Sequence, residues 1–257
     1  MSRHSWSKLP RIFIVFSIVY GLAIFLPLII AVSNGRITPY VPYISEGGGQ
    51  YPEAGIFSTL IVITAFTCEV IIFLRYLVVE GLSSQVSRSP ETYNFLNRVA
   101  LALGSMASFS LIVMASYPTT SITQVHNSAA GMVSICFMLY MICHTWISSL
   151  LSDSPTIPKL RLFIIISSSI ALIMIAAFGL MGSFHWKDNK YVGSKEPEDK
   201  GFAFYVVSAS AEWIFVLLIL LFFITFINEF KKSTFHFYLE IPSKSLTRVP
   251  RITITSA

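Results

Sequence analysis

Residues 12–32 read IFIVFSIVYGLAIFLPLIIAV, an unbroken run of 21 residues that contains no charged side chain. A helix needs about 20 predominantly apolar residues to cross the hydrocarbon core of a bilayer. Water is absent from that core, so the backbone must satisfy its own hydrogen bonds, which only helices and closed barrels achieve. Because apolar and polar residues do not alternate in the run, it predicts a transmembrane helix.

Five further stretches of this kind follow, and together the six occupy more than half of the 257 residues. Only 12% of the residues are charged, against roughly 25% in a soluble domain. We therefore expect an all-α polytopic membrane protein with six transmembrane helices in one bundle. The bundle would span residues 12–230, between an N-terminal segment 1–11 and a tail 231–257. Its predicted spans are 12–32, 55–79, 96–117, 128–151, 160–184 and 202–227.

The basic residues are distributed asymmetrically about these spans. The two chain ends and the second and fourth loops, with the helix ends beside them, hold 13 of the 18 Lys and Arg residues. Lys and Arg stay preferentially on the cytoplasmic side of a membrane. This predicts that both termini face the cytosol and that the first, third and fifth loops lie in a lumen or outside the cell. The net charge of +5 reflects this asymmetry, so we expect no nucleic-acid partner.

The sequence carries no recognisable catalytic or metal-binding pattern. Catalysis needs a nucleophile near a base, or a metal with enough ligands, and neither H-E-x-x-H nor G-x-S-x-G occurs. The three cysteines (Cys68, Cys136 and Cys143) lie inside predicted spans, so they form no disulfide framework for the loops. The first apolar stretch is longer than the core of a signal peptide, and we expect it to remain as an anchor. We expect no catalytic residue, cofactor or metal.

Two carboxylates, Glu69 and Glu212, fall inside predicted spans. A charge at that depth costs at least about 2.5–3.5 kcal/mol, so each must face the bundle, be paired or carry a proton. Arg75 is a poor partner for Glu69, because six residues along a helix place it far around the cylinder. The two acids are consistent with an interhelical hydrogen bond from a protonated carboxyl. They are also consistent with a proton-linked or polar-headgroup site.

The loops offer residues suited to helix ends. Pro52 and Glu53 fit the start of the second helix, where a proline loses no hydrogen bond and an acid complements the helix dipole. His126 is expected to cap the fourth helix at the membrane interface. The charged run from Lys195 to Lys200 is expected to be a solvated loop.

Several separate blocks together resemble the damage-regulated autophagy modulator (DRAM) family. The resembling residues are Pro42, Tyr43, Ile44, Ser45, Glu46, Pro52, Glu53, Gly55 and Phe57 in the first block, Arg75 and Tyr76 in the second, Ala211, Glu212 and Trp213 in the third, Thr225, Phe226, Ile227, Glu229 and Phe230 at the end of the sixth span, and His126 at the start of the fourth. The wider six-helix family includes proteins of GPI-anchor lipid remodelling and of phosphoinositide regulation.

The resemblance implies a multi-pass protein of the lysosomal or endosomal membrane that promotes autophagy without catalysing a reaction. Its partners would be membrane lipids and other membrane proteins. Two alternatives stay open. One is an accessory factor or enzyme of GPI-anchor lipid remodelling in the Golgi, with Glu212 as its main residue. The other is a proton-linked transporter that uses Glu69 and Glu212. A Golgi or plasma-membrane location accordingly stays open as well.

The tail contains a short pattern that resembles a signal for sorting to endosomes. Residues 238–241 match the tyrosine-based sorting signal Y-x-x-Φ, with Tyr238 and Ile241 at its two defining positions. A sorting adaptor in the cytosol is therefore a further expected partner. The same aromatic segment is also consistent with a position on the membrane surface.

Overall fold

The computed structural model describes residues 2–6, 9–83, 90–151, 155–186, 190–239 and 253–256. These ranges contain six long helices, each long and apolar enough to cross a membrane. They are α1 (Arg11–Ser33), α2 (Glu53–Ser83), α3 (Pro90–Ser116), α4 (Thr123–Leu151), α5 (Thr156–His185) and α6 (Phe202–Ile224). This confirms the predicted all-α, six-helix class.

Several helices extend beyond the apolar stretches that predict them. Helix α4 begins at Thr123, five residues before the predicted span, because a helix continues through polar residues once its hydrogen bonding is established. The last apolar stretch is interrupted instead: α6 ends at Ile224, and a short helix, α7 (Ile227–Lys231), follows. At the break, the Thr225 hydroxyl donates a 2.6 Å hydrogen bond to the carbonyl of Phe222.

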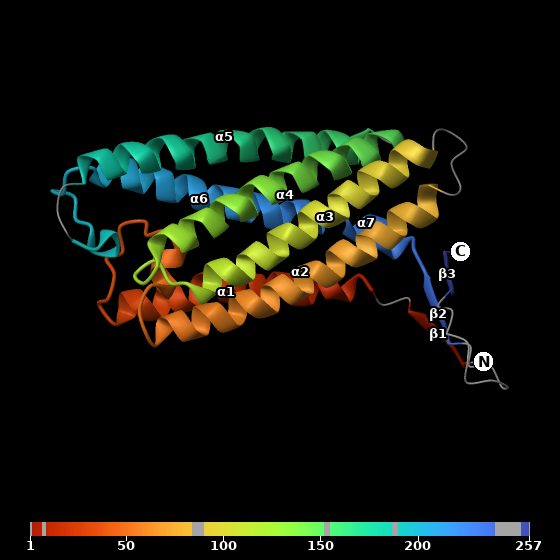
Figure 1. The fold of residues 1–257 in the computed structure, drawn as a ribbon, viewed down its shortest axis with the longest axis horizontal. Coiled ribbons are helices and arrows are strands. Elements are labelled where there is room, and N and C mark those ends of the chain that lie inside the picture. The colour runs from red at the N-terminus through yellow and green to blue at the C-terminus, as the bar shows by residue number, and fades with distance from the viewer. Residues whose placement is uncertain are drawn as a thin grey trace.

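The helices lie side by side along the length of an elongated bundle (Figure 1). Neighbours in sequence pack together, namely α1 with α2, α2 with α3, α3 with α4, and α5 with α6. Both chain termini lie at one end, here called the terminal end (Figure 1). Segments 34–52, 117–122 and 190–201 gather at the opposite end, here called the loop end (Figure 1). The assignment of the terminal end to the cytosol stays a prediction.

Small residues let the helices approach one another. A Cβ atom added to Gly104 in α3 would lie 2.9 Å from the Ile72 side chain and 3.1 Å from that of Tyr140. The absence of a side chain therefore allows α3 to pack against both α2 and α4, as is typical of helix association in lipid. Large apolar side chains such as Phe109 and Phe163 are exposed on the outside of the bundle, where lipid would cover them.

A small antiparallel sheet joins the two ends of the chain. Its strands are β1 (Ser2–Trp6), β2 (Phe235–Leu239) and β3 (Thr253–Ser256), with β2 in the centre. This sheet was not predicted from the sequence, although aromatic residues such as those of β2 favour strands. Tyr238 lies in β2, where its backbone is paired with Arg3 and Thr253. Ile241 lies outside the described residues, so the sorting signal stays a prediction.

Candidate functional site

The first block of the family-like residues forms a tight turn at the loop end. The 3₁₀ helix η1 (Ile44–Gly48) begins there, and the Glu46 carboxylate accepts a 2.9 Å hydrogen bond from the backbone N–H of Tyr43. Two glycines let η1 fit between α1 and α2. A Cβ on Gly47 would lie 2.8 Å from the Leu28 backbone, and one on Gly48 would clash with the Phe57 side chain.

Glu46 forms a buried ion pair with a residue from a different loop. Its Oε2 lies 3.0 Å from Nζ of Lys195, and the two side chains are only 5% and 0% exposed. Lys195 directly follows the short 3₁₀ helix η2 (Val192–Ser194). Thr38 fastens the two loops further, because its N–H bonds to the carbonyl of Gly193 (2.8 Å) and its hydroxyl to that of Lys195 (2.7 Å).

The sequence interpretation of Lys195 as part of a solvated loop was therefore wrong. A charged group leaves water only when a partner compensates the lost hydration. Here the partner, Glu46, lies 149 positions away in the sequence. The pattern around Lys195 resembles any exposed charged loop, so no local signal indicated its burial. Tyr191, whose hydroxyl lies 3.4 Å from the Glu46 carbonyl, was missed for the same reason.

Helix α6 contributes two neighbouring residues to this site. The Glu212 carboxylate accepts a 2.9 Å hydrogen bond from the backbone N–H of Ile44. The Trp213 indole N–H donates to the carbonyl of Pro42 at 2.9 Å, and its ring stacks on that of Phe25 at 5.2 Å. The first and third family-like blocks therefore meet. We call the group formed by Tyr43, Glu46, Lys195, Glu212 and Trp213 the loop-end cluster.

Burial dominates the electrostatics of the loop-end cluster. It raises the pKa of Glu46, although the nearby charge of Lys195 acts in the opposite direction. Burial also raises the pKa of the Tyr43 phenol, and it raises that of Tyr191 to about 12 with a smaller contribution from the charge of Glu46. Both phenols are consequently neutral at physiological pH and serve as hydrogen-bonding and packing groups.

Other predicted residues lie at the same end but outside the cluster. Glu53 is buried in the first turn of α2, as expected, and its Oε1 accepts a hydrogen bond from Asn34 (2.9 Å) and pairs with Arg36 (3.1 Å). These contacts hold the end of α1 to the start of α2. Ser45 is partly buried within η1, whereas Pro52 and Gly55 are exposed beside Glu53.

His126 lies in the first turn of α4 and is buried. Its Nδ1 is 3.0 Å from the carbonyl of Met114 and 2.8 Å from that of Tyr117. Met114 lies in the last turn of α3, and Tyr117 directly follows that helix. His126 therefore satisfies the C-terminal end of α3, whereas the sequence interpretation had it capping its own helix.

The two acids predicted to lie within the membrane have different partners. Glu69 on α2 accepts a 2.7 Å interhelical hydrogen bond from the Ser105 hydroxyl on α3. The donor is thus the serine, whereas the bond considered from the sequence was donated by a protonated carboxyl. Glu212 bonds instead to the backbone of η1. Arg75 pairs with Glu229 rather than with Glu69, in agreement with the helical geometry.

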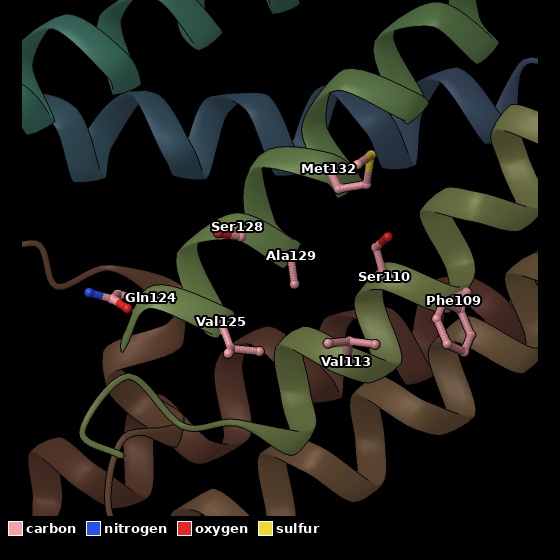
Figure 2. A pocket seen from close by; sticks show the side chains of 8 residues that line it. All are labelled: Phe109, Ser110, Val113, Gln124, Val125, Ser128, Ala129 and Met132. Carbon is pink, nitrogen blue, oxygen red and sulfur yellow. The ribbon is translucent and has the colours of Figure 1, made fainter. Parts of the chain in front are cut away.

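A shallow groove of about 390 Å³ lies between α3 and α4 (Figure 2). Its lining is mostly apolar, with Phe109 and Val113 on α3 and Val125 and Met132 on α4. None of the predicted site residues lines it. Within the described ranges, no group of three or more His, Cys, Asp or Glu side chains is arranged to hold a metal ion.

The fold and the cluster together define a class: a six-helix membrane protein whose first interhelical loop is docked onto the sixth helix. Residues 7–233 match the family described as Frag1/DRAM/Sfk1/Cwh43P N-terminal domain, and the chain belongs to this family. The resemblance to the DRAM family is thereby confirmed. No solved structure matches the chain.

Curated relatives cover nearly the whole chain. It is 25% identical over 248 residues to DNA damage-regulated autophagy modulator protein 1 of Xenopus laevis, covering 93% of this chain and 98% of the relative. It is 29% identical over 223 residues to the protein of the same name from Mus musculus, covering 85% and 90%. It is 28% identical over 240 residues to DNA damage-regulated autophagy modulator protein 2 of Bos taurus, covering 88% and 84%.

Proposed function

We propose that this protein is a non-enzymatic modulator of autophagy in the lysosomal or endosomal membrane, acting through contacts with membrane proteins or lipids. The observation that carries the proposal is the similarity, along almost the full length, to relatives named autophagy modulators. The family-like residues Tyr43, Glu46, Glu212 and Trp213 add structural support, because they meet in the loop-end cluster.

The contacts of the cluster support a binding role over turnover of a substrate. The carboxylates of Glu46 and Glu212 accept hydrogen bonds from backbone N–H groups, and Glu46 is also paired with Lys195. Carboxylates used in this way fix the shape of a loop. The resulting rigid end of the bundle presents exposed aromatic side chains, including Tyr40 (44% exposed) and Tyr51 (76% exposed). Loops held by a rigid scaffold are common sites of recognition.

The test is to delete the gene, measure autophagic flux and locate the untagged protein in its own cell. Deletion should alter flux, and the protein should coincide with lysosomal or endosomal markers. Wild type and the control Glu198→Gln, which changes an exposed acid of the fifth loop, should restore flux. Glu46→Gln at equal abundance should not. Unchanged flux after deletion, together with an exclusively plasma-membrane location, overturns the proposal.

A further inference from the structure

A second buried charged group lies at the terminal end, away from the loop-end cluster. Arg75 on α2 and Arg161 on α5 both contact Glu229 on α7, with N–O distances of 3.3 Å and 2.7 Å. The arginine side chains are 1% and 0% exposed, and that of Glu229 is 26% exposed. Two buried cations thus share one carboxylate, which leaves one positive charge uncompensated within this trio, here called the arginine cluster.

The two arginines differ in how fully their donors are used. Arg161 donates to the Thr225 hydroxyl at 2.8 Å and to the Ser148 hydroxyl as well as to Glu229. Arg75 uses only one nitrogen, since its Nε and Nη1 are buried without a hydrogen-bond partner among the described residues. A guanidinium offers five N–H donors, and leaving buried charged donors unsatisfied is costly. Arg75 therefore has unused capacity for an anion.

Aromatic rings pack beside the Arg75 guanidinium. The Arg75 guanidinium lies 4.7 Å from the centre of the Phe226 ring, and the rings of Tyr140 and His144 pack on the same phenylalanine at 6.4 Å and 5.4 Å. The Tyr140 hydroxyl and His144 Nδ1 are also buried without a partner in the described part of the chain. Additional hydrogen-bonding groups accordingly lie beside the uncompensated charge.

The depth of the cluster suits a lipid headgroup. Helix α2 has 31 residues, or about 46 Å at 1.5 Å per residue, so its ends project about 8 Å beyond a 30 Å hydrocarbon core. Arg75 lies eight residues before Ser83, the last residue of α2, or about 12 Å from the helix end. The guanidinium is therefore close to the boundary between acyl chains and headgroups. Within the trio, Glu229 is the partly exposed member.

We propose that the arginine cluster binds a phosphate group, with Arg75 as the main donor. Arginine suits this ligand because its planar fork donates two parallel hydrogen bonds to phosphate oxygens. The phosphate can be carried by an acidic phospholipid or be free in solution. In the topology predicted from the basic residues, this end meets the cytoplasmic leaflet, which is rich in anionic lipids.

The experiment uses the full-length protein in nanodiscs of phosphatidylcholine, with or without phosphatidic acid, and measures lipid retention and thermal unfolding. Wild type should retain phosphatidic acid preferentially and unfold at a higher temperature in its presence. Arg75→Gln should weaken retention by about tenfold to a hundredfold, the loss of a hydrogen bond to a charged group. Arg98→Gln, which removes an exposed arginine of α3 near the same end, should retain the lipid like wild type.

A second arm distinguishes the source of the phosphate. Inorganic phosphate is added to the protein in phosphatidylcholine nanodiscs at constant ionic strength. If the ligand is a lipid, the unfolding temperature should rise little. If the ligand is a free phosphate, it should rise as much as it does with phosphatidic acid. Glu229→Gln gives an independent check, because removing the competing carboxylate should strengthen binding of phosphatidic acid, whereas a purely structural trio would only lose stability. Wild-type protein that responds to neither phosphate source overturns the proposal, since the compensating charge must then belong to the protein itself.

Discussion

Replacing Lys195 with Met is the most direct test of the loop-end cluster. The variant leaves the Glu46 carboxylate, which is 5% exposed, with only the backbone N–H of Tyr43 as a donor. At the observed 3.0 Å and an effective dielectric constant of about 20, the lost attraction is about 5.5 kcal/mol. Measurements on other buried pairs give about 3–5 kcal/mol when one partner is removed. We therefore expect the free energy of unfolding to fall by about 3–5 kcal/mol.

The measurement is the unfolding free energy in mild detergent micelles, titrated with sodium dodecyl sulfate and followed by tryptophan fluorescence. Lys190→Met is the matched control, because this lysine belongs to the same loop but is 31% exposed and pairs with acids at the surface. It should change stability little. The double variant Glu46→Gln with Lys195→Met should lose clearly less than the sum of the two single changes. Equal losses for the two lysine variants, or full additivity in the double variant, would refute the buried pair.

Three further predictions concern acidity, packing and sorting. Burial raises the pKa of Glu46 above its ordinary 4.5. The stability gained from protonating this carboxyl is therefore full below about pH 4.5 and is lost as the pH rises through the folded-state pKa. Wild type should gain stability on acidification relative to Glu46→Gln, and parallel pH profiles of the two proteins would contradict this. Gly104→Ala should destabilise by about 1–3 kcal/mol in the same unfolding assay, whereas Gly131→Ala, with nothing within 4 Å of the added carbon, should not. Tyr238→Ala should shift the protein to the cell surface in a biotinylation assay, and an unchanged surface fraction would remove the sorting role.

Much of the fold could be predicted because the relevant signal is local. An apolar run such as residues 12–32 specifies a spanning helix without reference to any other part of the chain. The interruption at Thr225 was not predictable in this way. There the Thr225 hydroxyl donates a hydrogen bond to its own helix and accepts one from Arg161. The mean hydropathy of the segment does not depend on such contacts.

The candidate site was only half predictable. The family resemblance pointed to Glu46 and Glu212, yet nothing in the sequence indicated that both bond to the turn containing Tyr43 and Ile44. Lys195 was assigned to solvent, although it is fully buried. The error has a physical cause: the hydration lost by a charge depends on its surroundings, and these come from residues distant in the sequence.

By itself, the sequence determined the number of spans. Because this number is even, both ends of the chain lie at the same end of the bundle. It also determined that charge is scarce in the interior. Only the tertiary structure decided how the remaining charges are compensated, with Glu46 facing Lys195 and Arg75 sharing Glu229 with Arg161. The sequence and the tertiary structure determine different features because hydrophobic burial follows from the composition of one segment, whereas an ion pair requires two groups within a few ångströms of each other.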